Sequence, residues 1–160
     1  MCGEEDAIPV DFSAGRGEVA EAYLSKGRYW GEQAQGLIDP GLIRLVRYRQ
    51  GSTLRSATHC GAEAGWEVSQ VESIRQEAIG ALREAFDGEP DGTWLQGNVA
   101  TQLGFTLLED GDVDGAREVS GFASTTPYGG GFMGTLPTHG PWSAYDALQR
   151  AIARTDVALS

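Results

Sequence analysis

This sequence has few residues that form disulfide bonds or bind metal ions. Cys2 and Cys60 are its only cysteines, and His59 and His139 are its only histidines. A paired-cysteine metal site and a framework of several disulfides are therefore excluded. With 160 residues, 41% of them hydrophobic, the chain is nevertheless long enough to fill the core of one domain without such cross-links.

Long apolar runs are also missing, since no stretch approaches the length of a membrane span or of a signal-peptide core. We therefore expect a soluble, cytoplasmic protein. The alternative is an extracytoplasmic lipoprotein anchored through Cys2, because Met1, Cys2 and Gly3 followed by acidic residues also fit the start of a mature lipoprotein. An exported protein would be able to join Cys2 to Cys60, whereas a cytosolic one would keep both reduced.

Positive charge is scarce, because the net charge is -11 and Lys26 is the only lysine. Binding to nucleic acid or to anionic membranes needs many Lys and Arg side chains, so we expect neither. The charge is uneven: residues 26–55 hold six basic and two acidic residues (+4), and residues 63–118 hold three basic and thirteen acidic residues (-10). One interpretation is that the two stretches face each other or solvent. The other is that the basic stretch, which contains Arg44, Arg47 and Arg49, binds an acidic region of a partner.

The periodicity of the apolar residues predicts an all-α protein. Residues 1–15 are acidic and irregular, so we expect a flexible arm there. The predicted elements are a helix from about residue 18, a short helix at 42–49, a core helix at 64–86 with an apolar stripe from Val68 to Phe86, a helix from about 94, and a last helix after Pro141. Residues 50–63 are predicted to be either a loop or the tail of the preceding helix.

Residues 99–127 predict two short helices that form a hairpin. Gly111 is able to close the first helix in the left-handed conformation, and Asp112 is placed to cap the second, which we expect to be lined by Val113, Ala116, Val119 and Phe122. The hairpin resembles a single tetratricopeptide repeat in the following positions: Leu103, Gly104, Leu107, Gly111, Ala116, Ala123 and Pro127. It departs from the family pattern at Ala100, Leu107 and Ser120, where aromatic residues are usual. The resemblance implies a surface that binds a protein rather than an active site.

A long loop rich in Gly, Thr and Pro is predicted at residues 125–141. Tyr128, Phe132 and Met133 lie within it, and three consecutive glycines give its backbone freedom. Exposed aromatic and Met side chains favour contact with a partner. The alternative is a loop whose aromatic side chains pack back onto the core.

Asp110, Asp112 and Asp114 alternate with other residues and are followed by Gly115, as in the first half of a calcium-binding loop. The second half does not fit, because Gly121 stands where a bidentate Glu belongs. A helix-capping turn explains the same residues, and we favour it over a weak calcium site.

Cys60, His59 and His139 are the residue types of a thiol nucleophile with its base, or of ligands for a soft metal. Their spacing is diagnostic of neither chemistry. A half-buried free Cys beside a surface His is the simpler interpretation, and a thiol- or metal-dependent enzyme is the alternative.

Together these patterns predict a small bundle of five or six helices, with residues 16–160 forming one domain and the hairpin packed against the 64–86 helix. The favoured function is a protein-binding module, of the adaptor or of the immunity or inhibitor type, without a cofactor. The predicted partner-binding residues are Arg44, Arg47, Arg49, Tyr128, Phe132 and Met133. A thiol or metal enzyme and an extracytoplasmic lipoprotein with a weak calcium site are the alternatives.

Overall fold

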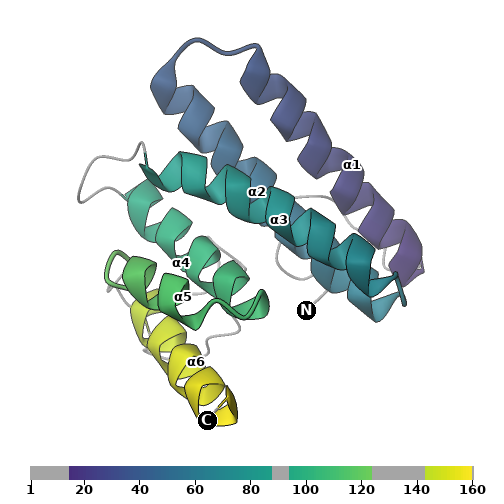
Figure 1. Ribbon diagram of the computed structural model, residues 1–160. Coiled ribbons are helices and arrows are strands. Elements are labelled where there is room, and N and C mark those ends of the chain that lie inside the picture. The colour runs from purple at the N-terminus through teal and green to yellow at the C-terminus, as the bar shows by residue number, and fades with distance from the viewer. Residues whose placement is uncertain (1–14, 88–93, 124–142, 160) are drawn as a thin grey trace. The chain divides into compact units, whose positions relative to one another are not determined.

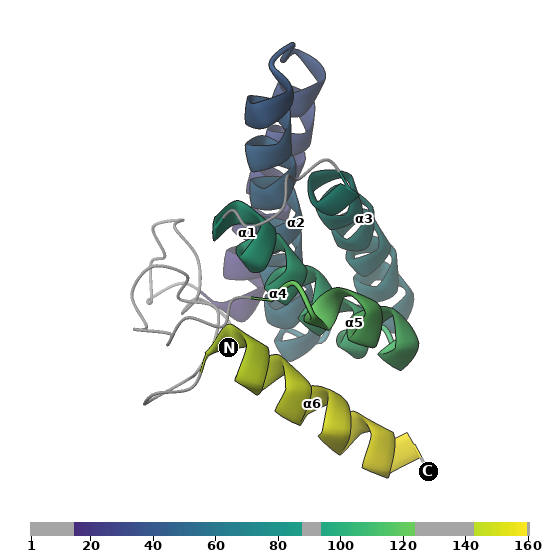
Figure 2. The same ribbon diagram turned by 90° about the vertical axis from the view of Figure 1, so that its left-hand side faces the viewer.

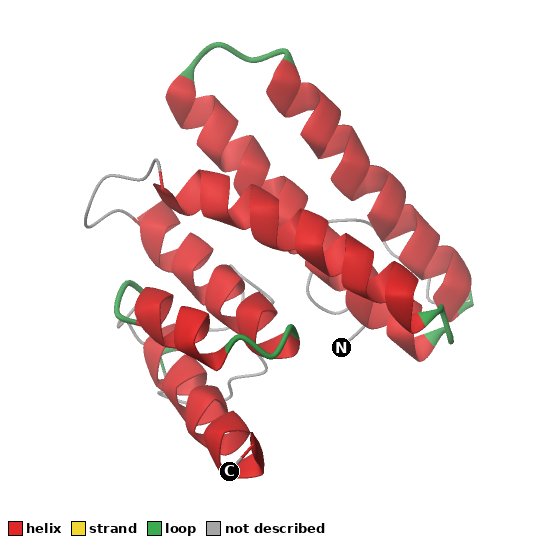
Figure 3. Cartoon of the chain, in the orientation of Figure 1, coloured by secondary structure: helices red, strands yellow, loops and turns green. Residues whose placement is uncertain are grey.

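The computed structural model describes residues 15–87, 94–123 and 143–159. These residues form six α-helices and no β-strand (Figures 1 and 3). The predicted fold class, a small all-α bundle, is confirmed. The chain divides into two compact units, Met1–Gly88 and Glu89–Ser160. The single domain and the packing of the hairpin against the 64–86 helix concern both units and stay predictions.

The first unit begins with α1, Arg16–Gln35, which ends at Gly36. The predicted start near residue 18 is therefore two residues late. Buried residues recur along one side of α1 at helical spacing and include three small ones, Gly27, Gly31 and Ala34. Because these side chains are so short, that side of α1 is able to approach a neighbouring helix closely.

Helix α2, Pro40–Glu63, joins the predicted 42–49 helix and the undecided 50–63 segment into one element of 24 residues. Asp39 caps it, with its carboxylate accepting a hydrogen bond from the Gly41 backbone N–H at 3.3 Å. Pro40 occupies the first turn, where its missing N–H costs nothing. The segment 50–63 is therefore helical. Its residues are small because α2 packs between neighbours that leave room only for small side chains.

Helix α3, Val68–Asp87, starts four residues after the predicted position. Gly65 adopts a left-handed φ of 85°, which ends α2 and separates the two helices. Val68, expected in the apolar stripe, is 70% exposed because it lies at the very first position of the helix. Phe86, the last residue of the stripe, is only partly buried. The residues between them face the core as predicted, with these side chains buried: Val71, Ile74, Ala78, Ile79, Leu82 and Ala85.

Helix α2 packs against both α1 and α3 in the first unit. At Gly27 of α1, an added Cβ would lie 2.6 Å from a methyl carbon of Leu54. At Gly51 of α2, an added Cβ would lie 3.1 Å from the backbone oxygen of Ala78 on α3. Both glycines therefore set how closely the helices approach. The core between them contains the following buried residues: Val19, Ala20, Tyr23, Leu24, Leu54, Ala57, Cys60, Ile74 and Ala78.

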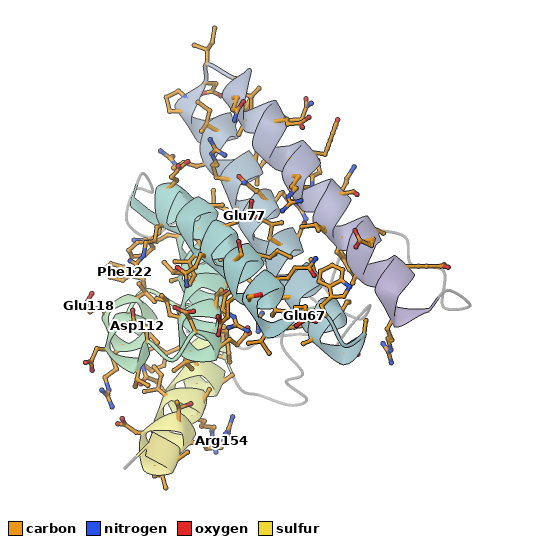
Figure 4. The ribbon with its side chains drawn as sticks, turned by 45° about the vertical axis from the view of Figure 1, so that its right-hand side comes forward. Glu67, Glu77, Asp112, Glu118, Phe122 and Arg154 are labelled. Carbon is orange, nitrogen blue, oxygen red and sulfur yellow. The ribbon has the colours of Figure 1, made fainter. Side chains whose placement is uncertain are left out.

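The second unit contains the predicted hairpin, formed by α4, Trp94–Glu109, and α5, Val113–Ser120. Gly111 adopts a left-handed φ of 86°, and Asp112 caps α5 by accepting a hydrogen bond from the Gly115 N–H at 2.8 Å. Phe122 was expected to line the second helix. It lies instead beyond the end of α5 and is 47% exposed (Figure 4), because the helix stops at Ser120.

Helix α6, Ala144–Leu159, packs against α4 and α5. A Cβ added at Gly104 of α4 would lie 2.5 Å from a methyl carbon of Leu148, so these helices also meet at a glycine. Arg117 of α5 forms an ion pair with Asp156 of α6. Leu148 and Ile152 are buried, and α6 remains helical as far as Leu159.

We expect Gly51→Ala to lower the free energy of unfolding by about 1–3 kcal/mol, because the new methyl group collides with Leu82 and with the Ala78 backbone oxygen. Gly80→Ala is the matched control. Gly80 lies in α3, and nothing lies within 4 Å of an added Cβ there, so the exchange should stabilise the protein by about 0.5–1 kcal/mol through helix propensity. Urea unfolding measures both, and equal effects would contradict the close packing of α2 on α3.

Candidate interaction surface

The turn between α1 and α2 projects beyond the end of α3 (Figures 1 and 2). The register of α2 against α3 explains this. Arg47 forms an ion pair with Glu84 at 2.7 Å, and α3 ends three residues later, at Asp87. Since the two helices run in opposite directions, the first turn of α2 and the turn before it extend past the end of α3. Helix α1 packs along α2 in this unit.

Apolar side chains in this projecting end are not buried. None of the residues 36–47 is buried, although the stretch includes six Leu, Ile and Val residues. Ile38 in the turn is 92% exposed, and Leu42 in the first turn of α2 is 48% exposed. Leu42, Leu45, Val46 and Arg49 are spaced i, i+3, i+4 and i+7, so they share one side of α2. We call Ile38, Leu42, Leu45, Val46 and Arg49 the tip surface.

A second exposed feature lies on the last turns of α1. The Lys26 ammonium group is 4.6 Å from the ring centre of Tyr29 and 4.9 Å from that of Trp30. The two rings are 5.5 Å apart, and Tyr29 is 44% exposed. The cation–π contacts hold the only lysine of the chain against two aromatic rings, which places a positive charge beside exposed aromatic surface.

The three predicted partner-binding arginines of α2 differ in their surroundings. Arg49 is exposed. Arg44 is partly buried, and so is Arg47, which pairs with Glu84 and donates a hydrogen bond to the Gln50 side-chain oxygen at 2.8 Å. Arg47 therefore helps to hold α2 against α3, and Arg49 is the arginine of this set best placed to meet a partner.

The uneven charge along the chain has a partial explanation in the first unit. Arg28 of α1 lies 3.4 Å from Glu77 of α3, which Figure 4 labels, and Arg47 pairs with Glu84. Two basic residues of the 26–55 stretch thus face acidic residues of the 63–118 stretch, as one of the two interpretations of the sequence expected. Exposed ion pairs of this kind add little to stability.

The remaining predicted contact residues, Tyr128, Phe132 and Met133, lie outside the described residues. The same holds for His139, for the rest of the predicted loop, and for residues 1–14 of the predicted arm. Their roles stay predictions.

Two of the three aspartates of the predicted calcium loop, Asp112 and Asp114, have partners within the hairpin. Asp112 caps α5, and Asp114 forms an ion pair with Arg117 at 3.0 Å. In the part of the chain that the structure describes, no three His, Cys, Asp or Glu side chains are grouped so as to hold a metal ion. The predicted cap at Asp112 is therefore present, and calcium binding stays an untested alternative.

We expect Asp112→Ala to lower the free energy of unfolding by about 1 kcal/mol, because the cap of α5 is lost. Millimolar calcium should leave the thermal unfolding temperature of the wild-type protein unchanged. Differential scanning fluorimetry with calcium or with a chelator measures this. An increase with calcium that Asp112→Ala abolishes would restore the calcium interpretation.

Cys60 is disulfide-bonded and fully buried, with 0% of its surface exposed. The sequence analysis favoured a free thiol here, and that prediction is wrong. A disulfide sulfur in the core is not a nucleophile that a substrate is able to reach, so the geometry gives no support to a thiol enzyme at Cys60. His59 is partly exposed.

Comparisons with protein-family models, curated proteins and solved structures find no match to this chain. The single-repeat resemblance of residues 99–127 therefore stays a likeness of pattern. Among the described helices, none combines the length and apolar character that a membrane crossing requires. The geometry of the two units is thus the basis for any functional argument.

The sequence analysis used the apolar residues of the tip surface only to recognise a helix. Their spacing carried a further signal, because Leu42, Leu45 and Val46 lie on one side of the helix and Arg44 and Arg47 on the other. An apolar side of a helix is normally covered by a neighbour. The structure leaves none of the three apolar residues buried.

Proposed function

We propose that this protein is a protein-binding module that engages its partner through the tip surface. The observation that carries the proposal is the exposure of Ile38 and Leu42, close together at one end of a unit that has a packed core. Scattered exposed apolar residues are common, whereas several of them at one projecting end favour a contact site.

The free energy available at this end is sufficient for specific binding. Fully burying a Leu or Ile side chain contributes about 1.5–3 kcal/mol. Ile38, Leu42, Leu45 and Val46 retain part of that contribution, because none of them is buried within the chain. Tyr29, exposed farther along α1, is of a residue type that often dominates binding energy.

The charges around the tip surface favour a partner with acidic residues around an apolar contact. Arg49 is exposed on the same side of α2 as Leu42. Residues 26–55 carry a net charge of +4, of which the pairs of Arg28 and Arg47 with glutamates neutralise two charges. Such a surface accelerates association with an acidic partner and favours its orientation. An adaptor and an immunity or inhibitor protein are two forms of this function.

Site-specific photo-crosslinking tests the proposal in cells of the source organism. A photoreactive amino acid at position 42 should attach a partner protein, whereas the same group at position 68 should not. Val68 is a suitable control because it is 70% exposed and lies at the opposite end of the first unit's α2–α3 pair. Equal crosslinking at both positions, or none at position 42, would contradict the proposal. A crosslink to a second copy of this chain would show self-association instead.

Once the partner is identified, we expect the double variant Ile38→Ser/Leu42→Ser to weaken binding by about tenfold to a hundredfold, since two apolar contacts are lost. The double variant Val68→Ser/Val157→Ser removes apolar groups of similar exposure, 70% and 75%, and should bind as the wild type does. Arg49→Glu should reduce the association rate, most strongly at low salt. Calorimetry and surface plasmon resonance measure these effects, and circular dichroism checks that each variant remains helical.

A further inference from the structure

The sulfur of Cys60 lies where the three helices of the first unit meet. Cys60 is in the last turn of α2 and belongs to the same core cluster as Tyr23 of α1 and Ile74 of α3. It is fully buried, and it is disulfide-bonded. The bond therefore reaches the interior of the unit rather than its surface.

We propose that Cys60 is bonded to Cys2, and that the protein works outside the cytoplasm without a lipid anchor on Cys2. Cys2 is the only other cysteine of the sequence. A bond between the Cys60 residues of two copies would require both sulfurs to leave their cores, because each is fully buried. A bond within the chain is therefore the arrangement that leaves the core intact, and it fastens the acidic N-terminal segment to α2.

The compartment follows from the chemistry of the bond. Two thiols give up two protons and two electrons when the sulfur–sulfur bond forms. The oxidant is a protein disulfide of the thiol-oxidising machinery, which takes up both and becomes a dithiol. Such oxidants keep disulfides formed in extracytoplasmic compartments, whereas the cytosol keeps thiols reduced. The sequence analysis preferred the cytoplasm, and the proposal replaces that preference.

The same bond separates the two extracytoplasmic alternatives. A bacterial lipoprotein anchor is a thioether between the cysteine sulfur and a diacylglycerol. A cysteine sulfur has two covalent bonds, one of them to its own Cβ, so it is able to carry either the thioether or the disulfide. If Cys2 is bonded to Cys60, Cys2 is not lipidated.

Peptide mapping of the protein from its source organism tests the bond. Cells are lysed in iodoacetamide, which alkylates free thiols, and the purified protein is digested with trypsin without reduction. The expected product is a peptide ending at Arg16 joined to residues 56–75, the tryptic peptide that contains Cys60. Alkylation of both cysteines, a diacylglycerol adduct on Cys2 with alkylated Cys60, or residues 56–75 joined to a second copy would each overturn the proposal.

A thermodynamic cycle tests the bond through stability. If the two cysteines are bonded, Cys2→Ala should lower the unfolding temperature of the oxidised protein by on the order of 10 °C, although Cys2 is distant in sequence from the core. Cys60→Ala added to Cys2→Ala should then lower it by only a few degrees further. Dithiothreitol should lower the wild-type temperature and leave both variants unchanged. An unchanged temperature in Cys2→Ala would overturn the bond, even if Cys60→Ala failed to fold.

Discussion

The close approach of α2 to its two neighbours is the constraint on which the first unit depends. Gly27 of α1 accommodates Leu54 of α2, and Gly51 of α2 accommodates Leu82 and the Ala78 backbone of α3. Larger residues at either glycine would separate the helices and open the core around Tyr23. The low helix propensity of glycine is thus offset by packing that only a residue without a side chain permits.

The contacts that build this core also determine which surface remains open. Gly51 and Arg47 fix the register of α2 against α3, and in that register α3 ends beside the second turn of α2. Leu42 and Leu45 lie on the side of α2 turned away from Gly51, so packing on α3 leaves them uncovered.

A disulfide bond and close side-chain packing both occur at the C-terminal end of α2. Cys60 lies one residue before Gly61, on which the ring of Trp66 packs after the chain has turned at Gly65. The disulfide-bonded end of α2 is thereby enclosed, whereas the end at Ile38 is open. The two ends of α2 therefore differ: a buried, disulfide-bonded residue lies near one end, and exposed apolar residues lie at the other.

The sequence by itself determined the helical fold class, the Gly111–Asp112 turn and most of the α3 stripe, because each depends on local spacing and on the backbone preferences of a few residues. It did not determine whether residues 50–63 are helical, since small polar residues reveal their role only when neighbouring helices press against them. The state of Cys60 and the openness of the tip surface were likewise decided by tertiary structure. Both depend on which segments lie beside α2, and no local pattern records that.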